Sequence, residues 1–262
     1  MQVQQNYFNG VGVLITHYNR SKSLERLLKA FHDLNCSFEE IVVSDDGSRP
    51  EHLEYIKRLQ DSFNFKLVTT DVNMGLGNNI NKGQDAVTAP LTLYVQEDFE
   101  PSTQFVEHFS DALHFMKERD DLDIIRFYAY FKYPYTKPYQ KGFSEMVFRS
   151  APWYLNHLKF HFYSDHPHLR RSDFFSKFGR YREGISGDKT EYSMSLSFIK
   201  HKAKGLFYDE FTTLFYQKNN ADEPSTMGRA GWREGKNPLI LFVRFCYLQM
   251  KFIKCTLDLL FY

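Results

Sequence analysis

The first hundred residues alternate between short apolar runs and segments with helical spacing. Val11–Ile15 is apolar and long enough for a buried strand, whereas Ser21–Asn35 places leucine and phenylalanine three or four residues apart. The same patterns predict strands at 40–44, 65–69 and 91–95 and helices at 53–63 and 77–87. Strands that alternate with helices across short connections indicate an α/β fold, with a mostly parallel sheet flanked by helices on both faces.

The pattern changes in the second half. Residues 127–163 are dense in aromatic side chains and interrupted by prolines, which predicts irregular strands and loops. The rings are expected mostly to pack in the core or at an edge, with stacking on a bound ligand as the alternative. Residues 190–202 are expected to form a helix and 205–215 a strand. The polar segment 218–238 is expected to be a mobile loop.

Composition excludes several classes of protein. Lys and Arg total 33 against 32 Asp and Glu, so no overall charge favours nucleic acid binding. An aromatic content of 17% argues against disorder. Cys36, Cys246 and Cys255 are too scattered for a disulfide framework or a zinc cluster. The start of the chain is polar, and no run of about 18 apolar residues occurs, so we expect a cytoplasmic protein.

Polar residues follow each of the first four predicted strands. These segments are 16–20, 45–48, 73–83 and 96–100. Ligands of such sheets bind beyond the carboxyl ends of the strands, so the four segments together predict a binding site. Alone, Asp45-Asp46-Gly47-Ser48 is most often a plain turn. No Gly-x-Gly follows the first strand, which argues against a dehydrogenase.

In this order, segments 15–20, 43–48, 73–83 and 94–98 resemble the inverting glycosyltransferases of family 2, which have the GT-A (nucleotide-diphospho-sugar transferase) fold. The resemblance covers residues 11–101. It implies transfer of a hexose from a nucleotide-diphosphate donor, with UDP-sugar expected, to a glycan or lipid-linked acceptor. Bacterial polysaccharide biosynthesis is the implied setting. The corresponding organisation is a nucleotide-sugar-binding half (1–101) and an acceptor-binding and catalytic half (102–217).

The resemblance also implies a metal site and donor contacts. A diphosphate bound without a Walker loop needs a hard cation, here Mn or Mg, with oxygen ligands. Asp98 aligns with the metal-binding Asp of the family's Asp-x-Asp, Glu97 fills the middle position, and Gln96 replaces the first Asp. The alternative is an acidic turn that caps a helix near Ser102. The implied donor-binding residues are Thr16, Tyr18, Asn19, Arg20, Asp45, Asp46, Asn73, Gly75, Asn81 and Glu97.

Inversion needs a general base for the acceptor hydroxyl. In the family this base follows a Gly-x-x-Asp-Glu turn by about eight residues and opens a helix, and residues 179–183 resemble that turn. Glu191 is therefore the implied base, with Asp188 as the alternative and Thr190 in place of the usual Glu. A helix-capping role is the competing interpretation for these residues.

Two further segments carry charge. Residues 165–171 hold two histidines and the pair Arg170 and Arg171, which predicts a surface loop at the acceptor cleft, with the arginines either solvated or facing the departing diphosphate. In segment 239–262 the charges Arg244, Lys251, Lys254 and Asp258 fall on one narrow stripe of an otherwise apolar helix. Such an amphipathic helix fits a membrane interface, the domain itself or another chain.

Two other functions remain open. A sugar-nucleotide nucleotidyltransferase shares the sheet and the acidic strand end, but it needs a glycine-rich loop, which segment 16–20 lacks. A catalytically inactive nucleotide-sugar-binding module is compatible with Gln96 and Thr190.

Overall fold

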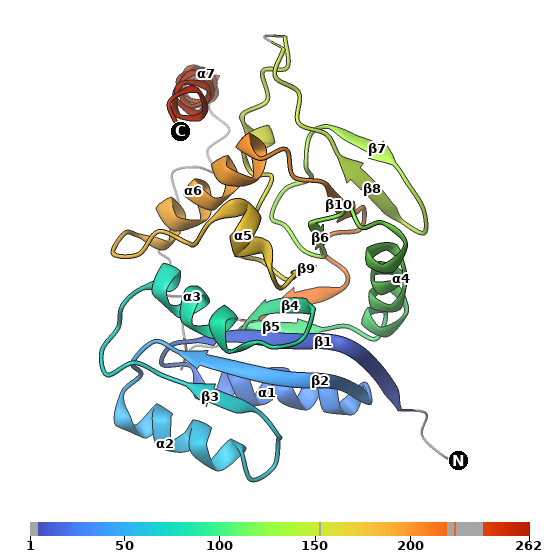
Figure 1. The fold of residues 1–262 in the computed structure, drawn as a ribbon. Helices are drawn as coiled ribbons and strands as arrows, with labels where there is room; N and C mark the ends of the chain where they lie inside the picture. Colours follow the sequence, from blue (N-terminus) through green and yellow to red (C-terminus); the bar gives the residue numbers. More distant parts are fainter. Residues whose placement is uncertain (1–4, 152, 219–222, 224–237) are drawn as a thin grey trace.

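The computed structural model describes residues 5–151, 153–218, 223 and 238–262 (Figure 1). The helices are α1 (Ser21–Asp33), α2 (Pro50–Leu59), α3 (Leu76–Ala86), α4 (Phe105–Glu118), α5 (Phe174–Phe178), α6 (Gly187–Lys200), α7 (Pro238–Leu260) and the 3-10 helix η1 (His157–Phe160). The strands are β1 (Asn6–His17), β2 (Cys36–Asp45), β3 (Lys66–Val68), β4 (Leu91–Gln96), β5 (Phe99–Pro101), β6 (Ile124–Arg126), β7 (Thr136–Pro138), β8 (Phe143–Met146), β9 (His168–Arg171), β10 (Gly205–Tyr208) and β11 (Phe215–Gln217).

Nine strands form one sheet in the order β3-β2-β1-β4-β9-β6-β10-β8-β7. The strands β1 to β4 pair in parallel, and β6 pairs in parallel with β10. Only β9 and the β7–β8 hairpin bring antiparallel pairs into this sheet. The expected α/β sheet with flanking helices and a C-terminal helix is therefore confirmed, but the sheet is mixed rather than mostly parallel, with four parallel and four antiparallel strand pairs.

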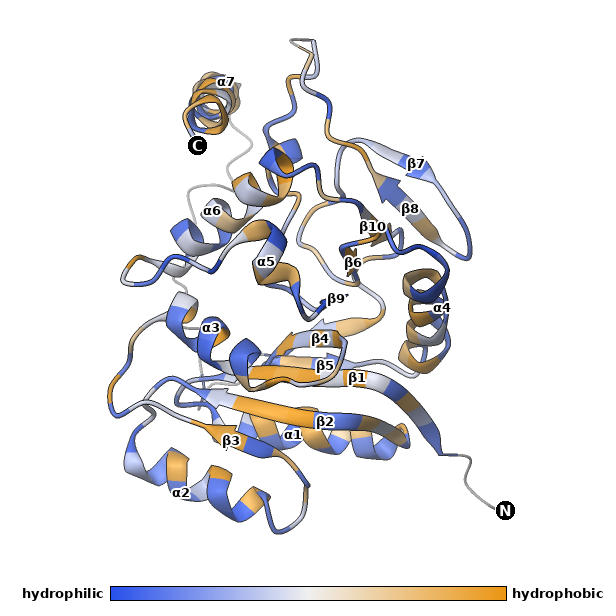
Figure 2. Ribbon diagram, viewed as in Figure 1, coloured by the Kyte–Doolittle hydropathy of each residue, from blue (hydrophilic) through white to orange (hydrophobic). Residues whose placement is uncertain are grey.

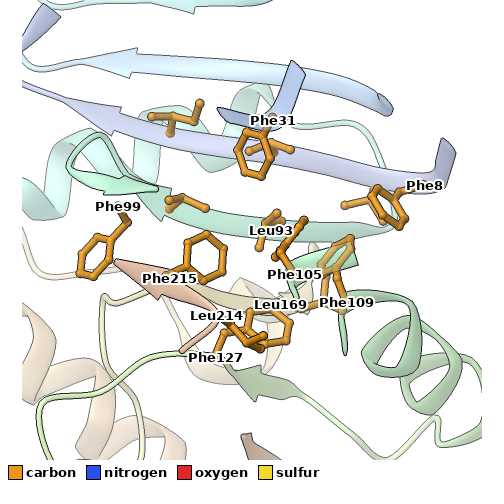
Figure 3. Close-up of a cluster of buried hydrophobic side chains, with 14 of the residues drawn as sticks. Phe8, Phe31, Leu93, Phe99, Phe105, Phe109, Phe127, Leu169, Leu214 and Phe215 are labelled. Carbon is orange, nitrogen blue, oxygen red and sulfur yellow. The ribbon is translucent and has the colours of Figure 1, made fainter. Parts of the chain in front are cut away.

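A core rich in phenylalanine lies between the sheet and the helices α1 and α4 (Figure 3). Phe105 and Phe109 of α4 stack at 4.8 Å between ring centroids, and Leu93 and Leu169 contribute from the sheet. Full burial of one such side chain stabilises the fold by about 2–3 kcal/mol. Figure 2 shows the matching pattern, with apolar residues along the strands and polar residues on the outer faces of α1 and α2.

Two segments differ from the sequence-based expectation. The predicted strand 205–215 is two strands, and the second, β11, pairs with β5 in a separate two-stranded sheet. Residues 168–171, predicted as a surface loop, form β9 near the middle of the main sheet. The predicted loop 218–238 lies almost entirely outside the described residues. No helix in the described part of the chain is long and apolar enough to cross a membrane.

Candidate active site

Three neighbouring parallel strands bring polar residues to one edge of the sheet. In the register of β1 with its neighbours, His17 lies opposite Asp45, and Thr16 lies opposite Gln96. Thr16 is buried and shares a hydrogen bond of 3.0 Å with the hydroxyl of Tyr94. The prediction that the carboxyl ends of these strands meet at one edge of the sheet is therefore confirmed. The prediction was possible because parallel strands run in the same direction.

Asp45 is fully buried and saturated with hydrogen bonds. Its carboxylate meets His17 Nδ1 at 2.8 Å and accepts bonds from the backbone N–H of Ser48 and the hydroxyl of Thr69. Burial alone raises the pKa of Asp45, but the bonds to His17 and Ser48 outweigh it and hold the pKa well below its usual range. Asp45 is thus a charged structural centre at the end of β2.

Asp46 holds the loop before α3. Its two carboxylate oxygens accept the backbone N–H groups of Met74 at 2.8 Å and Gly75 at 2.9 Å. Gly47 adopts a φ of +67°, and a Cβ there would lie 2.4 Å from the carbonyl carbon of Val72. The turn and the loop 73–75 are therefore built against each other, which leaves the side chain of Asn73 exposed.

The segment after β1 wraps around the same turn. Tyr18 is half-buried, and Asn19 adopts a φ of +55°. The backbone N–H of Asn19 donates to Ser48 Oγ at 2.8 Å, and its side-chain oxygen accepts the N–H of Arg49 at 2.8 Å. These bonds fix the direction in which the next residue, Arg20, leaves the sheet.

Arg20 joins the two acidic residues after β4. Its Nη1 lies 3.1 Å from Asp98 Oδ2 and 3.4 Å from Glu97 Oε1. Gln217 of β11 also donates to Asp98 Oδ2, at 2.9 Å, whereas the buried Asp98 Oδ1 has no hydrogen-bond partner among the residues that the structure describes. Burial, together with the neighbouring Asp98, raises the pKa of Glu97 to about 8 despite Arg20.

The chemistry of this cluster fits a divalent cation. Asp98 offers a buried carboxylate oxygen that no donor in the described part of the chain satisfies, and Glu97 lies beside it. Glu100 is engaged elsewhere, with Arg26 at 3.1 Å and Lys218 at 2.6 Å. In the described residues no group of three or more His, Cys, Asp or Glu could hold a metal. A cation here would need substrate oxygens as its other ligands, as Mg²⁺ commonly does.

A second acidic pair lies across from this cluster. Gln96 Nε2 donates to Asp165 Oδ2 at 3.1 Å, so the residue that ends β4 contacts the segment before β9. The side chain of Ser164 and the backbone of Asp165 act on Glu191 of α6 and lower its pKa. Burial is the main cause that raises the pKa of both carboxyl groups. By contrast, Asp188 is exposed in the first turn of α6.

The turn before α6 is fixed to α3. Asn81 donates to the carbonyl oxygen of Tyr181 at 2.9 Å and to Glu183 at 2.8 Å, and it accepts the N–H of Tyr181 at 3.0 Å. A Cβ at Gly77 would lie 2.2 Å from the carbonyl oxygen of Arg182. The absence of a Cβ at Gly77 therefore allows the turn 181–183 to contact α3 closely, and the side chain of Asn81 binds the same turn.

The expected surface position of Arg170 and Arg171 is wrong. Arg170 is fully buried, donates to the Tyr181 hydroxyl at 2.7 Å and to Gln84 at 2.8 Å, and lies over the ring of Phe174. Arg171 donates to backbone carbonyl groups at the end of α4. Arg170 therefore stabilises the middle of the sheet without access to solvent, whereas Arg171 is half-buried and fastens β9 to the end of α4.

Sequence reasoning missed three residues of this region. Glu223 accepts the N–H groups of Lys22 and Ser23 at the start of α1, and Gln217 reaches Asp98 only because β11 pairs with β5. Asp165 lay in a cluster that was recognised as polar but given no catalytic role. No local pattern identifies such partners, since each is distant along the chain.

Comparisons with known proteins agree with this geometry. The family model described as glycosyl transferase family 2 matches residues 12–179. A cholesterol galactosyltransferase of Borreliella burgdorferi is 26% identical over 123 residues, which is 46% of this chain and 33% of that protein. A poly-beta-1,6-N-acetyl-D-glucosamine synthase of Staphylococcus epidermidis is 31% identical over 74 residues, 28% of this chain and 18% of that protein. The chain therefore spans a third or less of these curated relatives.

Solved structures share the fold. S. aureus TarS 1-349 in complex with UDP-GlcNAc superposes with a TM-score of 0.62 at 15% identity, over 95% of this chain and 72% of that chain. The mannosyltransferase PcManGT from Pyrobaculum calidifontis, in complex with GDP-Man and Mn²⁺, gives a TM-score of 0.54 at 12% identity, over 95% and 73%.

Proposed function

Because the chain belongs to glycosyl transferase family 2 and has the GT-A fold, we propose that it is an inverting hexosyltransferase that moves a sugar from a UDP-sugar to a glycan or glycolipid. One observation carries this proposal. Asp98, which follows β4, has a buried Oδ1 without a hydrogen-bond partner among the described residues, and Gln96, the last residue of β4, donates to Asp165, which acts on the pKa of Glu191. A donor-side carboxylate and a half-buried candidate base thus flank the end of one strand. The UDP-GlcNAc bound to TarS supports UDP as the nucleotide.

On the donor side, Asp98 would hold a Mn or Mg ion through Oδ1. When bound, such an ion neutralises the charge that develops on the departing diphosphate. Arg20 and Gln217 both contact Oδ2, so they orient the carboxylate with its other oxygen free. Thr16, Tyr18, Asn19, Asp45, Asp46, Asn73 and Gly75 would line the nucleoside side, where Asp45 and Asp46 also hold the loops in place.

On the acceptor side, Glu191 would accept the proton of the attacking hydroxyl. The acceptor oxygen forms its bond to the anomeric carbon while the bond from that carbon to the diphosphate oxygen breaks on the opposite face, so the configuration inverts. Desolvation raises the pKa of Glu191, which makes its carboxylate a stronger base. Ser164 and the backbone of Asp165 act in the opposite direction and favour the charged carboxylate, whereas the exposed Asp188 is the weaker candidate.

The outer face of α7 supports peripheral contact with a membrane, which suits a lipid-linked acceptor. Phe252, Cys255 and Leu259 pack against the body of the protein. At about 100° per residue, the opposite face carries Met250, Ile253, Leu257 and Leu260, all exposed. Such an apolar face beside basic side chains is typical of helices that lie in the membrane interface.

The assignment of the base is tested by substitution. We expect Glu191→Gln to lower the transfer rate at least a hundredfold while UDP binding stays within twofold, because proton transfer by a positioned base contributes about 10²–10⁴ in rate. The matched control is Asp188→Asn, which we expect to retain most of the activity. Product analysis by NMR would show inverted anomeric configuration. Full activity in Glu191→Gln with loss in Asp188→Asn would transfer the role to Asp188, and retained configuration would refute the mechanism.

A further inference from the structure

The β7–β8 hairpin lies at the opposite edge of the main sheet from β3 (Figure 1). A hollow of about 660 Å³ opens beside this hairpin. Its apolar lining includes the rings of Pro134, Tyr135 and Tyr154. The two tyrosine rings lie 5.0 Å apart between centroids and 80° between planes, so they form a corner. The volume lies within the range of pockets that bind small molecules.

The polar part of the lining is cationic. Lys132, Lys137 and Arg149 face the hollow, and its described lining residues include no Asp or Glu. The guanidinium of Arg149 lies over the ring of Tyr154, at 5.7 Å from its centroid. All three cationic side chains are exposed. An anion in the hollow would therefore be attracted by these charges, and no acidic residue of the described lining would repel it.

The walls of the hollow are fixed before any ligand binds. Lys159 is only 2% exposed, and its Nζ donates to the carbonyl oxygen of Arg149 at 2.7 Å and to that of Tyr154 at 3.0 Å. The backbone N–H of Asn156 donates to the Tyr135 hydroxyl at 3.3 Å. Lys159 therefore links the backbone of Arg149 to that of Tyr154, whose ring lies under the Arg149 guanidinium. Because these residues are ordered before a ligand binds, the entropy cost of binding is lower.

We propose that this hollow binds an anionic sugar, with the sugar ring on the faces of Tyr135 and Tyr154 and its carboxylate or phosphate on Arg149 and the two lysines. Charge-assisted bonds from a guanidinium are the strongest contacts available for such groups. The chain runs from Asn156 through η1 to Ser164 and Asp165 at the candidate active site. If the proposed function holds, the hollow would receive an acceptor residue remote from the one that reacts.

Isothermal titration calorimetry of the full chain with glucuronate, glucose 6-phosphate and glucose tests this proposal. We expect both anions to bind at least tenfold more tightly than glucose. Arg149→Gln should abolish most of that difference, and Tyr154→Ala should weaken all three sugars. The matched control, Lys29→Gln on the exposed face of α1, should bind like the wild type. Binding of only one anion would still support the site and would identify a carboxylate or a phosphate as its target.

Two results would overturn the proposal: anions that bind no better than glucose, or unchanged binding in both Arg149→Gln and Tyr154→Ala when circular dichroism shows them folded. Asp98→Asn separates this site from the proposed transferase function. We expect that variant to lose sugar transfer and to keep anionic-sugar binding, whereas Arg149→Gln should keep hydrolysis of a UDP-sugar in the absence of acceptor. These two variants therefore distinguish a failure of the anionic-sugar proposal from a failure of the proposed transferase function.

Discussion

At the scale of single residues, the acidic groups of this site divide into two kinds. Asp45 and Asp46 have their carboxylate oxygens bound by protein donors, so their charge maintains loop geometry. Among the described residues one buried oxygen of Asp98 has no hydrogen-bond partner, and desolvation raises the pKa of Glu191. Sequence reasoning located all four, but it could not separate structural from chemical roles, since the difference depends on partners far away in the chain.

Asp45→Asn should destabilise the protein and change how its stability depends on pH. The folded pKa of Asp45 lies below its ordinary value near 3.8, so its contribution is complete above that value and is lost as the pH falls towards the folded pKa. At pH 7 we expect a loss of about 2–4 kcal/mol in the free energy of unfolding, because the partners of a buried charge are left unsatisfied. Urea unfolding between pH 7 and pH 3 measures both effects, and equal losses at pH 7 and pH 3 would contradict the pKa argument.

At the scale of elements, apolar periodicity predicted the first half well. The predicted helix 21–35 is α1 (21–33), and the predicted strand 91–95 is β4 (91–96). In contrast, β9 was missed because His168 and two arginines look like a solvated segment, and only their pairing with β4 and β6 shows that they are buried. The split of β10 from β11 escaped notice for a similar reason, since β11 is defined by its distant partner β5.

The contact between α3 and the turn 181–183 positions the start of α6, and Gly77→Ala should disturb it. The added Cβ would lie 2.2 Å from the carbonyl oxygen of Arg182, so the turn must move. We expect a loss of about 1–3 kcal/mol in stability, which is typical of overpacking, and about a tenfold loss in transfer rate as Glu191 shifts. Gly187→Ala is the control, because its Cβ would meet only the side chain of Leu76, at 3.4 Å. Similar effects of the two variants on transfer rate would exclude this positioning role.

At the scale of the whole molecule, the parallel strands carry the polar residues that follow β1, β2 and β4 to one edge of the sheet, while α7 presents exposed apolar side chains such as Ile253 and Leu257. The sequence predicted the α/β class, the position of the first strand ends at one edge of the sheet, and the family. The hollow at the β7–β8 hairpin did not, because its walls come from residues 132–138 and 147–156, which local pattern describes only as irregular and aromatic.

The outer face of α7 should bind lipid. We expect co-sedimentation with vesicles that contain phosphatidylglycerol, and at least a fivefold weaker association when Met250 and Ile253 are both changed to Gln, since each change removes exposed apolar surface from the interface. The control is the pair Leu257 and Leu260 changed to Met, which keeps the face apolar. Equal binding of the wild type and the double Gln variant would show that lipid does not contact this face.

The central claim is that Asp98 binds the donor diphosphate through a cation, and titration of UDP by calorimetry with and without Mn²⁺ tests it most directly. We predict that Mn²⁺ strengthens UDP binding at least tenfold in the wild type and in Glu100→Gln, whose carboxylate is engaged with Arg26 and Lys218, and that this gain disappears in Asp98→Asn. UDP binding that is the same with and without Mn²⁺, or a gain that persists in Asp98→Asn, would contradict the account.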